Sequence, residues 1–243
     1  MSPSACWAVI PAGGTGSRFS STQNKLLAPL AGKPVLCRTV AALLGVPDIE
    51  GIVVTASADH LETYRHLLER EFPARNLRFT TGGSSRRASV YQGLLALPNH
   101  ATIALIHDAA RPLIQAQTIA QALQAVQQGA LGSVVAIPVV DTLKTVAPQG
   151  NSQGEPLTIT QTVDRSCFWR AQTPQVFQLE TLRQAHEQVP QEAVVTDDAQ
   201  LLELLNLGPL HIVPGEVSNL KITTPEDITL AEWYLQRAAY NRQ

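Results

Sequence analysis

Short apolar runs alternate with stretches of helical periodicity along most of the chain. Runs rich in Val, Ile, Leu and Ala predict strands buried on both faces, and they lie at 7–10, 52–55, 77–80, 103–106 and 133–139. Helical spacing of apolar residues predicts helices at 34–44, 59–72, 85–96, 118–128 and 224–240. This alternation predicts an α/β, Rossmann-like fold with a mostly parallel sheet flanked by helices.

Three polar motifs follow the ends of predicted strands. They cover residues 11–25, 82–89 and 107–111. Because ligands of open parallel sheets bind beyond the carboxyl ends of the strands, we expect these motifs to meet at one edge.

A different pattern begins at Asp141. Residues 142–146 and 157–160 alternate apolar and polar side chains with a period of two, and a stretch rich in Gly, Asn and Gln separates them. This predicts an antiparallel hairpin arm over 141–163, projecting from a single domain that spans 1–243. Because an isolated hairpin is marginal in water, a partner subunit could cover its apolar face. The alternative is that the hairpin folds back on its own domain.

Composition excludes several classes of protein. The net charge of −2 and the ordinary balance of 44% hydrophobic and 16% charged residues disfavour a nucleic-acid coat or a polybasic membrane anchor. No apolar stretch approaches the roughly 20 residues that span a membrane. The three cysteines form no C-x-x-C pair, and no metal site of protein ligands is expected. We expect a cytoplasmic protein, without nucleic-acid or membrane partners.

The most informative motif is the glycine-rich stretch at 11–18. Its glycines let the backbone approach a ligand and direct N–H groups at phosphate oxygens. A dinucleotide fingerprint fails at Phe19, and a Walker motif fails because Arg18-Phe19-Ser20 replaces Gly-Lys-Ser/Thr. A loop followed by Arg18 and Lys25 remains, and both cations suit a polyphosphate. A simple tight turn is the alternative.

Other polar residues keep a structural interpretation beside a functional one. Asp108 and Arg111 could form a structural ion pair, and His107 is expected to be a packed, hydrogen-bonded residue. The acidic pair at 197–198 could bind a metal, but capping of the following helix is favoured. Arg86 is interpreted as a solvated surface charge.

Eight segments together resemble the 2-C-methyl-D-erythritol 4-phosphate cytidylyltransferase family. They read A-G-G-T-G-S-R (12–18), N-K-L-L-A-P-L (24–30), G-G-S-S-R-R-A-S-V (82–90), H-D-A-A-R-P (107–112), V-V-D-T-L-K (139–144), A-Q-T-P-Q-V-F (171–177), T-D-D-A (196–199) and N-L-K-I-T-T-P-E-D (219–227). The chain departs from the family at Asn24 and Leu26, where Pro and Gln are common, and at Ser84, where an acidic residue is common.

The resemblance implies a nucleotidyltransferase fold, a homodimer joined through the arm, and binding of CTP, a polyol phosphate and Mg²⁺ held mainly by the triphosphate. The implied catalytic residues are Arg18, Lys25 and Lys221. The implied nucleotide-binding residues are Ala12, Gly13, Gly14, Gly16, Gly83, Ser89 and Asp108. The implied acceptor-binding residues are Arg111, Thr142, Thr196 and Arg165, the last reaching into the other subunit.

Several activities stay open at the level of sequence. The first is cytidylyl transfer to methylerythritol 4-phosphate; the second is the same transfer to another polyol phosphate such as ribitol 5-phosphate. A sugar-1-phosphate nucleotidyltransferase is a third. An NAD-dependent oxidoreductase is disfavoured by the failed fingerprint, and a protein that binds without catalysis is disfavoured by Arg18, Lys25 and Lys221 together.

Overall fold

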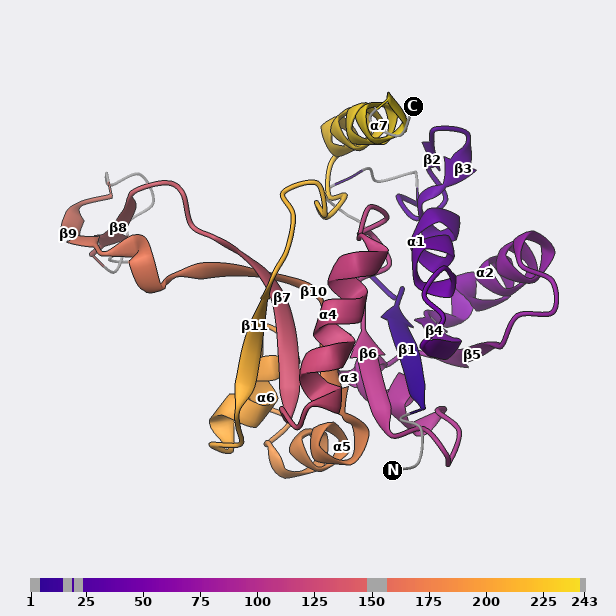
Figure 1. Ribbon diagram of the computed structural model, residues 1–243, viewed down its shortest axis with the longest axis horizontal. Helices are drawn as coiled ribbons and strands as arrows, with labels where there is room; N and C mark the ends of the chain where they lie inside the picture. Colours follow the sequence, from indigo (N-terminus) through magenta and orange to yellow (C-terminus); the bar gives the residue numbers. More distant parts are fainter. Residues whose placement is uncertain (1–4, 15–18, 20–23, 148–156, 241–243) are drawn as a thin grey trace.

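A seven-stranded sheet forms the centre of the protein. The computed structural model describes residues 5–14, 19, 24–147 and 157–240. The sheet has the order β11-β7-β10-β6-β1-β4-β5 (Figure 1). Its strands are β1 (Cys6–Pro11), β4 (Ile49–Ala56), β5 (Leu77–Thr81), β6 (Ile103–Ile106), β7 (Gly132–Pro138), β10 (Trp169–Gln178) and β11 (Leu210–Pro214). Only β10 runs antiparallel to its neighbours, so the mostly parallel sheet predicted from the sequence is confirmed.

Helices cover both faces of this sheet. They are α1 (Val35–Leu44), α2 (Ala58–Glu71), α3 (Arg86–Leu95), α4 (Ala116–Gln127), α5 (Leu179–Gln188), α6 (Ala199–Leu204) and α7 (Pro225–Tyr240). Along β1, Ala8 and Ile10 belong to the core layer that includes residues of α1, α2 and α4, whereas Trp7 and Val9 belong to the opposite layer, with residues of α3, α5 and α6. Burial on both faces explains why this strand is a continuous apolar run in the sequence.

Strand β10 was not predicted from the hydrophobic pattern, and neither were α5 and β11. Strand β10 lies inside the sheet, yet it contains buried Gln172 and Gln175 as well as Pro174. These amides have partners: Gln172 Nε2 donates to the Glu216 carbonyl at 3.0 Å, and Gln175 Nε2 donates to Asp197 Oδ2 at 2.8 Å. Satisfied hydrogen bonds therefore allow polar residues in a strand position that the pattern assigns to apolar ones.

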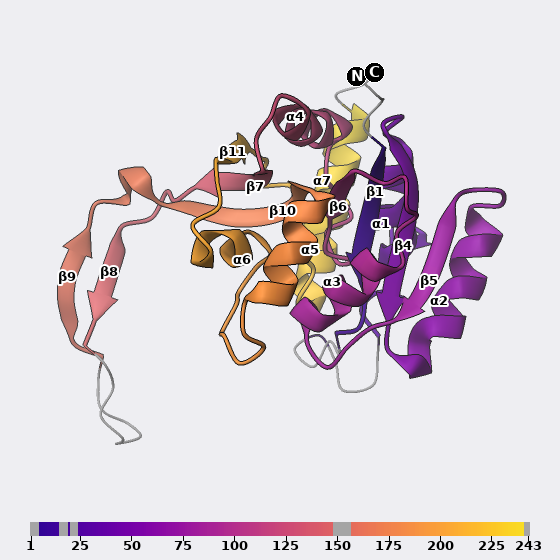
Figure 2. The same ribbon diagram turned by 90° about the horizontal axis from the view of Figure 1, so that it is seen from below.

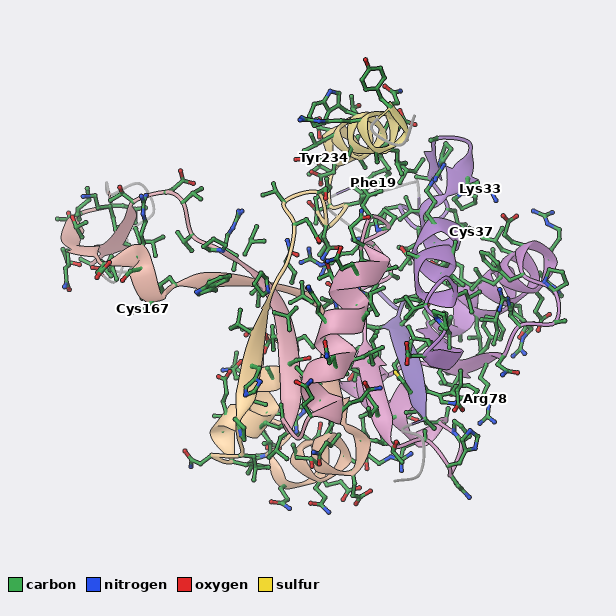
Figure 3. All side chains as sticks on the ribbon, viewed as in Figure 1. Phe19, Lys33, Cys37, Arg78, Cys167 and Tyr234 are labelled. Atoms are coloured by element: carbon green, nitrogen blue, oxygen red, sulfur yellow. The ribbon has the colours of Figure 1, made fainter. Side chains whose placement is uncertain are left out.

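The arm projects from the edge of the sheet where the parallel strands end. Strands β8 (Leu143–Val146) and β9 (Ile159–Val163) pair antiparallel, followed by a short 3₁₀ helix, η1 (Arg165–Cys167). The chain leaves at the end of β7 and returns at the start of β10 (Figures 1 and 2). The hairpin does not fold back on its own domain, and its side chains extend into open space, with Cys167 near the base (Figure 3). Val146 and Ile159 are 44% and 61% exposed.

A second two-stranded ribbon joins β2 (Pro29–Leu30) to β3 (Lys33–Pro34) just before α1. Within the part of the chain that the structure describes, every helix is too short or too polar to cross a lipid bilayer.

Close packing of α3 on the sheet makes Gly93 sensitive to substitution. A Cβ at Gly93 would lie 2.3 Å from Val9 Cγ1 and 3.0 Å from Thr55 Cγ2. Alanine normally favours a helix over glycine by about 1 kcal/mol. Here we expect Gly93→Ala to lower the free energy of unfolding by about 1–3 kcal/mol, because overpacking outweighs propensity. Urea unfolding measures this. Gln92→Ala, on the exposed side of the same helix, is the control and should be nearly neutral.

Candidate active site

A pocket of about 440 Å³ opens at the edge of the sheet where β1, β5 and β6 end. All three polar motifs predicted to meet there contribute to it, and residues 221 and 223 complete it. Its lining includes Ala12, Gly13, Gly14, Lys25, Gly83, Ser84, Ser85, Arg86, Ser89, Asp108, Lys221 and Thr223. The predicted site residues Gly16 and Arg18 lie outside the described residues.

The first wall is the glycine loop that follows β1. The N–H of Ala12 donates to the Thr55 carbonyl at 2.7 Å, which fixes the start of the loop against β4. Among the described residues, a Cβ at Gly14 would have no atom within 4 Å, whereas one at Gly13 would make ordinary contact with Ser89 Oγ at 3.6 Å. Without side chains at these two positions, a ligand can approach the backbone of the loop closely.

The second wall is the amino-terminal turn of α3. Ser85 caps the helix, since its Oγ accepts from the Ala88 N–H at 3.1 Å. Gly83 is required by packing, because a Cβ there would lie 2.4 Å from the Ala88 Cβ. Ser89 Oγ donates to the Gly83 carbonyl at 3.3 Å. The positive end of a helix therefore faces the pocket and favours anions.

A single carboxylate, Asp108, lies among three cations. Its oxygens are 2.9 Å from Lys221 Nζ, 3.3 Å from Arg86 Nε and 3.5 Å from Arg111 Nε. Burial acts to raise the pKa of Asp108, but the charges of Arg86, Lys221 and Arg111 and the hydrogen bond from Lys221 outweigh it. The pKa is held well below its ordinary value, and the carboxylate is ionised.

Arg86 links this cluster to a second buried acid. Its Nη2 lies 2.8 Å from Oδ2 of Asp198, a residue that is only 1% exposed. Burial acts to lower the pKa of Arg86, but Asp198 and Asp108 raise it, so the guanidinium remains charged. Burial raises the pKa of Asp198, against the charge of Arg86. Arg86 is thus part of the pocket wall, and its interpretation as a solvated surface charge is wrong.

Sequence reasoning missed Arg86 although one signal was available. It stands at the first position of a helix that begins at the predicted ligand edge. Nothing in the sequence, however, marks Asp108 or Asp198 as its partner. The neighbouring Asp197 accepts from the Gln200 N–H at 3.0 Å, so it caps α6, the favoured interpretation of this pair. No cluster of metal-binding side chains occurs within residues 5–14, 19, 24–147 and 157–240.

Lys25 and Lys221 come from opposite ends of the chain. Lys25 Nζ donates to the Ile222 carbonyl at 3.2 Å, and the Ile222 N–H donates to the Ala110 carbonyl at 2.8 Å. Arg111 Nη1 donates to the Asn219 carbonyl at 2.8 Å, so Arg111 holds the start of the segment that contains Lys221 and Ile222. Residues 219–223 are therefore fixed between the loop after β1 and the loop after β6.

A buried hydrogen-bond chain supports Asp108 from behind. The Asp108 N–H donates to Thr173 Oγ1 at 3.0 Å, and Thr173 Oγ1 lies 3.1 Å from His107 Nδ1. His107 Nε2 donates to the Arg111 carbonyl at 2.9 Å, so in the neutral ring Nδ1 accepts from Thr173. Burial lowers the pKa of His107 to about 4, and the residue is packed as expected.

Four predicted acceptor-binding residues do not line the pocket. Arg111 lies behind Asp108, and Thr196 donates from its N–H and Oγ1 to Gln200 Oε1 before α6. Thr142 and Arg165 lie on the arm, where Arg165 donates to the Val140 carbonyl. To reach a pocket, Thr142 and Arg165 would need a second subunit. The acceptor-binding roles of all four residues stay predictions.

A glycine-rich loop, clustered cations and a mostly parallel sheet are the arrangement expected of a nucleotidyltransferase. Comparison with known proteins narrows this class. The family described as IspD, 2-C-methyl-D-erythritol 4-phosphate cytidylyltransferase, matches residues 6–237. The chain belongs to this family.

Individual relatives are similar to this chain over nearly its full length. The chain is 43% identical over 236 residues to a 2-C-methyl-D-erythritol 4-phosphate cytidylyltransferase from Thermosynechococcus vestitus, covering 97% of both chains. It is 42% identical over 237 residues to the protein of that name from Acaryochloris marina, covering 97% of this chain and 96% of that one. Among solved structures, the 4-diphosphocytidyl-2C-methyl-D-erythritol synthase from Anaerococcus prevotii superposes with a TM-score of 0.82 at 27% identity. The superposition covers 96% of this chain and 97% of that one. The 2-C-methyl-D-erythritol 4-phosphate cytidylyltransferase from Thermus thermophilus superposes with a TM-score of 0.72 at 32% identity. The superposition covers 97% of this chain and 100% of that one.

The buried neutral His107 predicts an acid-dependent loss of stability. Its pKa is 6.5 in the unfolded chain and about 4 in the fold, so the unfolded state binds more protons in that window. Stability therefore falls as pH decreases through it, by on the order of 2 kcal/mol from this residue between about pH 7 and pH 5. We expect His107→Gln to flatten this part of the profile in urea unfolding. An unchanged slope would contradict the assignment. The loss from Asp108 does not interfere, because it begins only near its unfolded pKa of 3.8.

Proposed function

We propose that this pocket binds CTP and transfers its cytidylyl group to 2-C-methyl-D-erythritol 4-phosphate, giving 4-diphosphocytidyl-2-C-methyl-D-erythritol and pyrophosphate. The observation that carries the proposal is the meeting of the glycine loop with Lys25, Arg86 and Lys221 in one pocket. Membership of the cytidylyltransferase family supports the identity of both substrates.

The reaction joins two polyanions. An oxygen of the acceptor phosphate attacks the α-phosphorus of CTP, and the bond from that phosphorus to the bridging oxygen breaks. Pyrophosphate leaves with the electron pair. A phosphate monoester has a second pKa near 6 and is already mostly a dianion at neutral pH, so no general base is required. This agrees with the pocket, whose described lining contains no histidine.

The cations lower the electrostatic barrier. In the proposed arrangement the triphosphate lies along the glycine loop, with Lys25 and Arg18 on its phosphates and Lys221 near the attacking phosphate. Preorganised cations stabilise the charge that develops during transfer, and single arginines contribute up to about 10³–10⁵ in rate in phosphoryl transfer. The ties of Lys25 and Lys221 to neighbouring groups hold both ammonium groups before substrate arrives.

Asp108 has a different task from the cations. As an ionised carboxylate it repels phosphate but accepts hydrogen bonds from hydroxyl groups. We assign it to the ribose or polyol hydroxyls, which places the neutral parts of the substrates beside it. Gly83 and Ser89, on the wall formed by α3, are assigned to the cytosine edge, and Ser84 stands beside them.

A divalent ion fits this pocket only as a companion of the triphosphate. Mg²⁺ retains several waters and binds through one or two carboxylates together with substrate phosphates. In the described lining Asp108 is the one carboxylate, and three cations already surround it. The phosphates would therefore hold Mg²⁺, with Asp108 at most at its edge, and the ion would supply neutralisation of phosphate charge.

We further propose that the arm joins two chains into a homodimer. Apolar side chains on the arm, such as Val146 and Ile159, lie exposed in a single chain. The arm leaves the sheet at the same edge as the pocket, since Pro138 and Trp169 pair at its base. In such a dimer, Thr142 and Arg165 would reach the acceptor phosphate in the partner's pocket.

The first test combines a substrate panel with Lys25→Ala. We expect product and pyrophosphate from CTP with methylerythritol 4-phosphate, and little from ribitol 5-phosphate or from UTP and GTP. Lys25→Ala should lower kcat by about a hundredfold or more, because a cation acting on the transition state is lost. Lys33→Ala, which removes an exposed lysine paired with Glu71, is the control and should leave kcat unchanged. Preference for ribitol 5-phosphate would overturn the acceptor, and full activity of Lys25→Ala would overturn the site.

The second test mixes two variants with separate defects. If Arg165 acts in the partner's pocket, a heterodimer of Lys25→Ala and Arg165→Ala chains has one intact site and one doubly defective site. Random exchange should therefore restore about a quarter of the wild-type activity from two weak variants. Sedimentation equilibrium checks that dimers form. A chain that is monomeric, or variants that never complement, would contradict the shared site.

A further inference from the structure

Asn24 stands directly before Lys25, and its side chain makes two hydrogen bonds, one as an acceptor and one as a donor. Its Oδ1 accepts from the Leu26 N–H at 3.0 Å, which closes a small ring around the backbone of Lys25. Its Nδ2 donates to the hydroxyl of Tyr64 at 2.7 Å. Its own carbonyl accepts from the Leu27 N–H at 3.0 Å. The residue therefore organises the turn that carries Lys25.

Tyr64 is a rigid anchor for this turn. It lies on α2, is 1% exposed, and stacks on His60 with ring centroids 5.6 Å apart. His60 Nδ1 in turn lies 3.0 Å from Oγ of Ser57, the residue before α2. The hydrogen bond from Asn24 thus connects the lysine turn to a helix that packs on β4 and β5.

A second tie fixes the turn from its other side. Leu26 is 3% exposed within the core, and its carbonyl accepts from the Leu36 N–H at 3.0 Å. The backbone on either side of Lys25 is therefore held, by Asn24 before it and by Leu26 after it. A lysine side chain has four flexible carbons, so the position of its backbone decides how often its Nζ reaches the phosphates.

We propose that Asn24 is a positioning residue for Lys25, acting by tying the lysine turn to buried Tyr64 on α2. In this chain two side-chain hydrogen bonds, to the Leu26 N–H and to the Tyr64 hydroxyl, restrict the turn. The inference rests on the proposed role of Lys25 in cytidylyl transfer.

The expected kinetic effect is on turnover rather than on binding. Displacing a catalytic group by about 1 Å can cost about a hundredfold in rate. We expect Asn24→Ala to lower kcat by about tenfold, with KM for CTP and for the acceptor changed by less than about twofold. Tyr64→Phe removes only the anchor and should lower kcat by a smaller factor. The double variant should match Asn24→Ala alone, because both changes break one connection.

Two further variants separate positioning from general structural damage. Asn76→Ala removes a comparable bond, from Asn76 Nδ2 to the Glu50 carbonyl at 2.9 Å, away from the pocket lining, and should leave kcat unchanged. In a Lys25→Ala background, Asn24→Ala should cause no further loss in the residual rate, since its effect passes through the lysine. Thermal unfolding of each variant verifies that the fold is retained.

The outcomes distinguish this inference from the proposed function. Wild-type kcat in Lys25→Ala contradicts the proposed function itself. Wild-type kcat in Asn24→Ala, with Lys25→Ala impaired, contradicts the positioning role alone. Equal losses from Asn24→Ala with and without Lys25, or additive losses with Tyr64→Phe, would also overturn the inference. A loss confined to KM would do the same.

Discussion

The ionised carboxylate of Asp108 is the interaction on which the pocket depends. It draws together Arg86 from the start of α3, Arg111 from the loop after β6 and Lys221 from the segment before α7. These elements are far apart in the sequence, and three cations would repel one another without an anion between them. Asp108 and Asp198 are the carboxylates paired with these three cations, so the positive charges still outnumber the negative ones. The pocket is therefore stable when empty and attractive to phosphates when substrates arrive.

Polar burial around this cluster explains why the site is rigid. The single antiparallel strand, β10, places Thr173 behind Asp108, and Asn219 donates from Nδ2 to the Thr173 carbonyl at 2.9 Å and to Gln172 Oε1 at 2.8 Å. Each of these buried donors would destabilise the fold if it lost its partner. The same bonds that satisfy β10 thus hold the floor of the pocket and the segment that carries Lys221. Stability and function share one network here.

The sequence predicted those parts of the protein that depend on regular patterns. Strands such as β6, whose residues are all buried, are recognisable because apolar side chains face both layers of helices. The meeting of three motifs at one edge followed from the direction of parallel strands. The pattern did not predict β10, where glutamines take core positions because partners elsewhere satisfy them. Nor did it predict the role of Arg86, because an ion pair with Asp198, distant in sequence, becomes visible only when the chain is folded.

The composition of the pocket wall has a consequence for how the reaction responds to acidity. In the described lining no imidazole or thiol is available to titrate near neutrality, and Asp108 stays charged far into acid. The described lining then contributes no carboxylate, imidazole or thiol ionisation to the rate near neutral pH. The acid limb of the rate profile becomes a property of the acceptor's phosphate, whose second ionisation lies near pH 6. Catalysis of this kind needs no proton donor or acceptor in the protein, and its rate is insensitive to general-acid buffers.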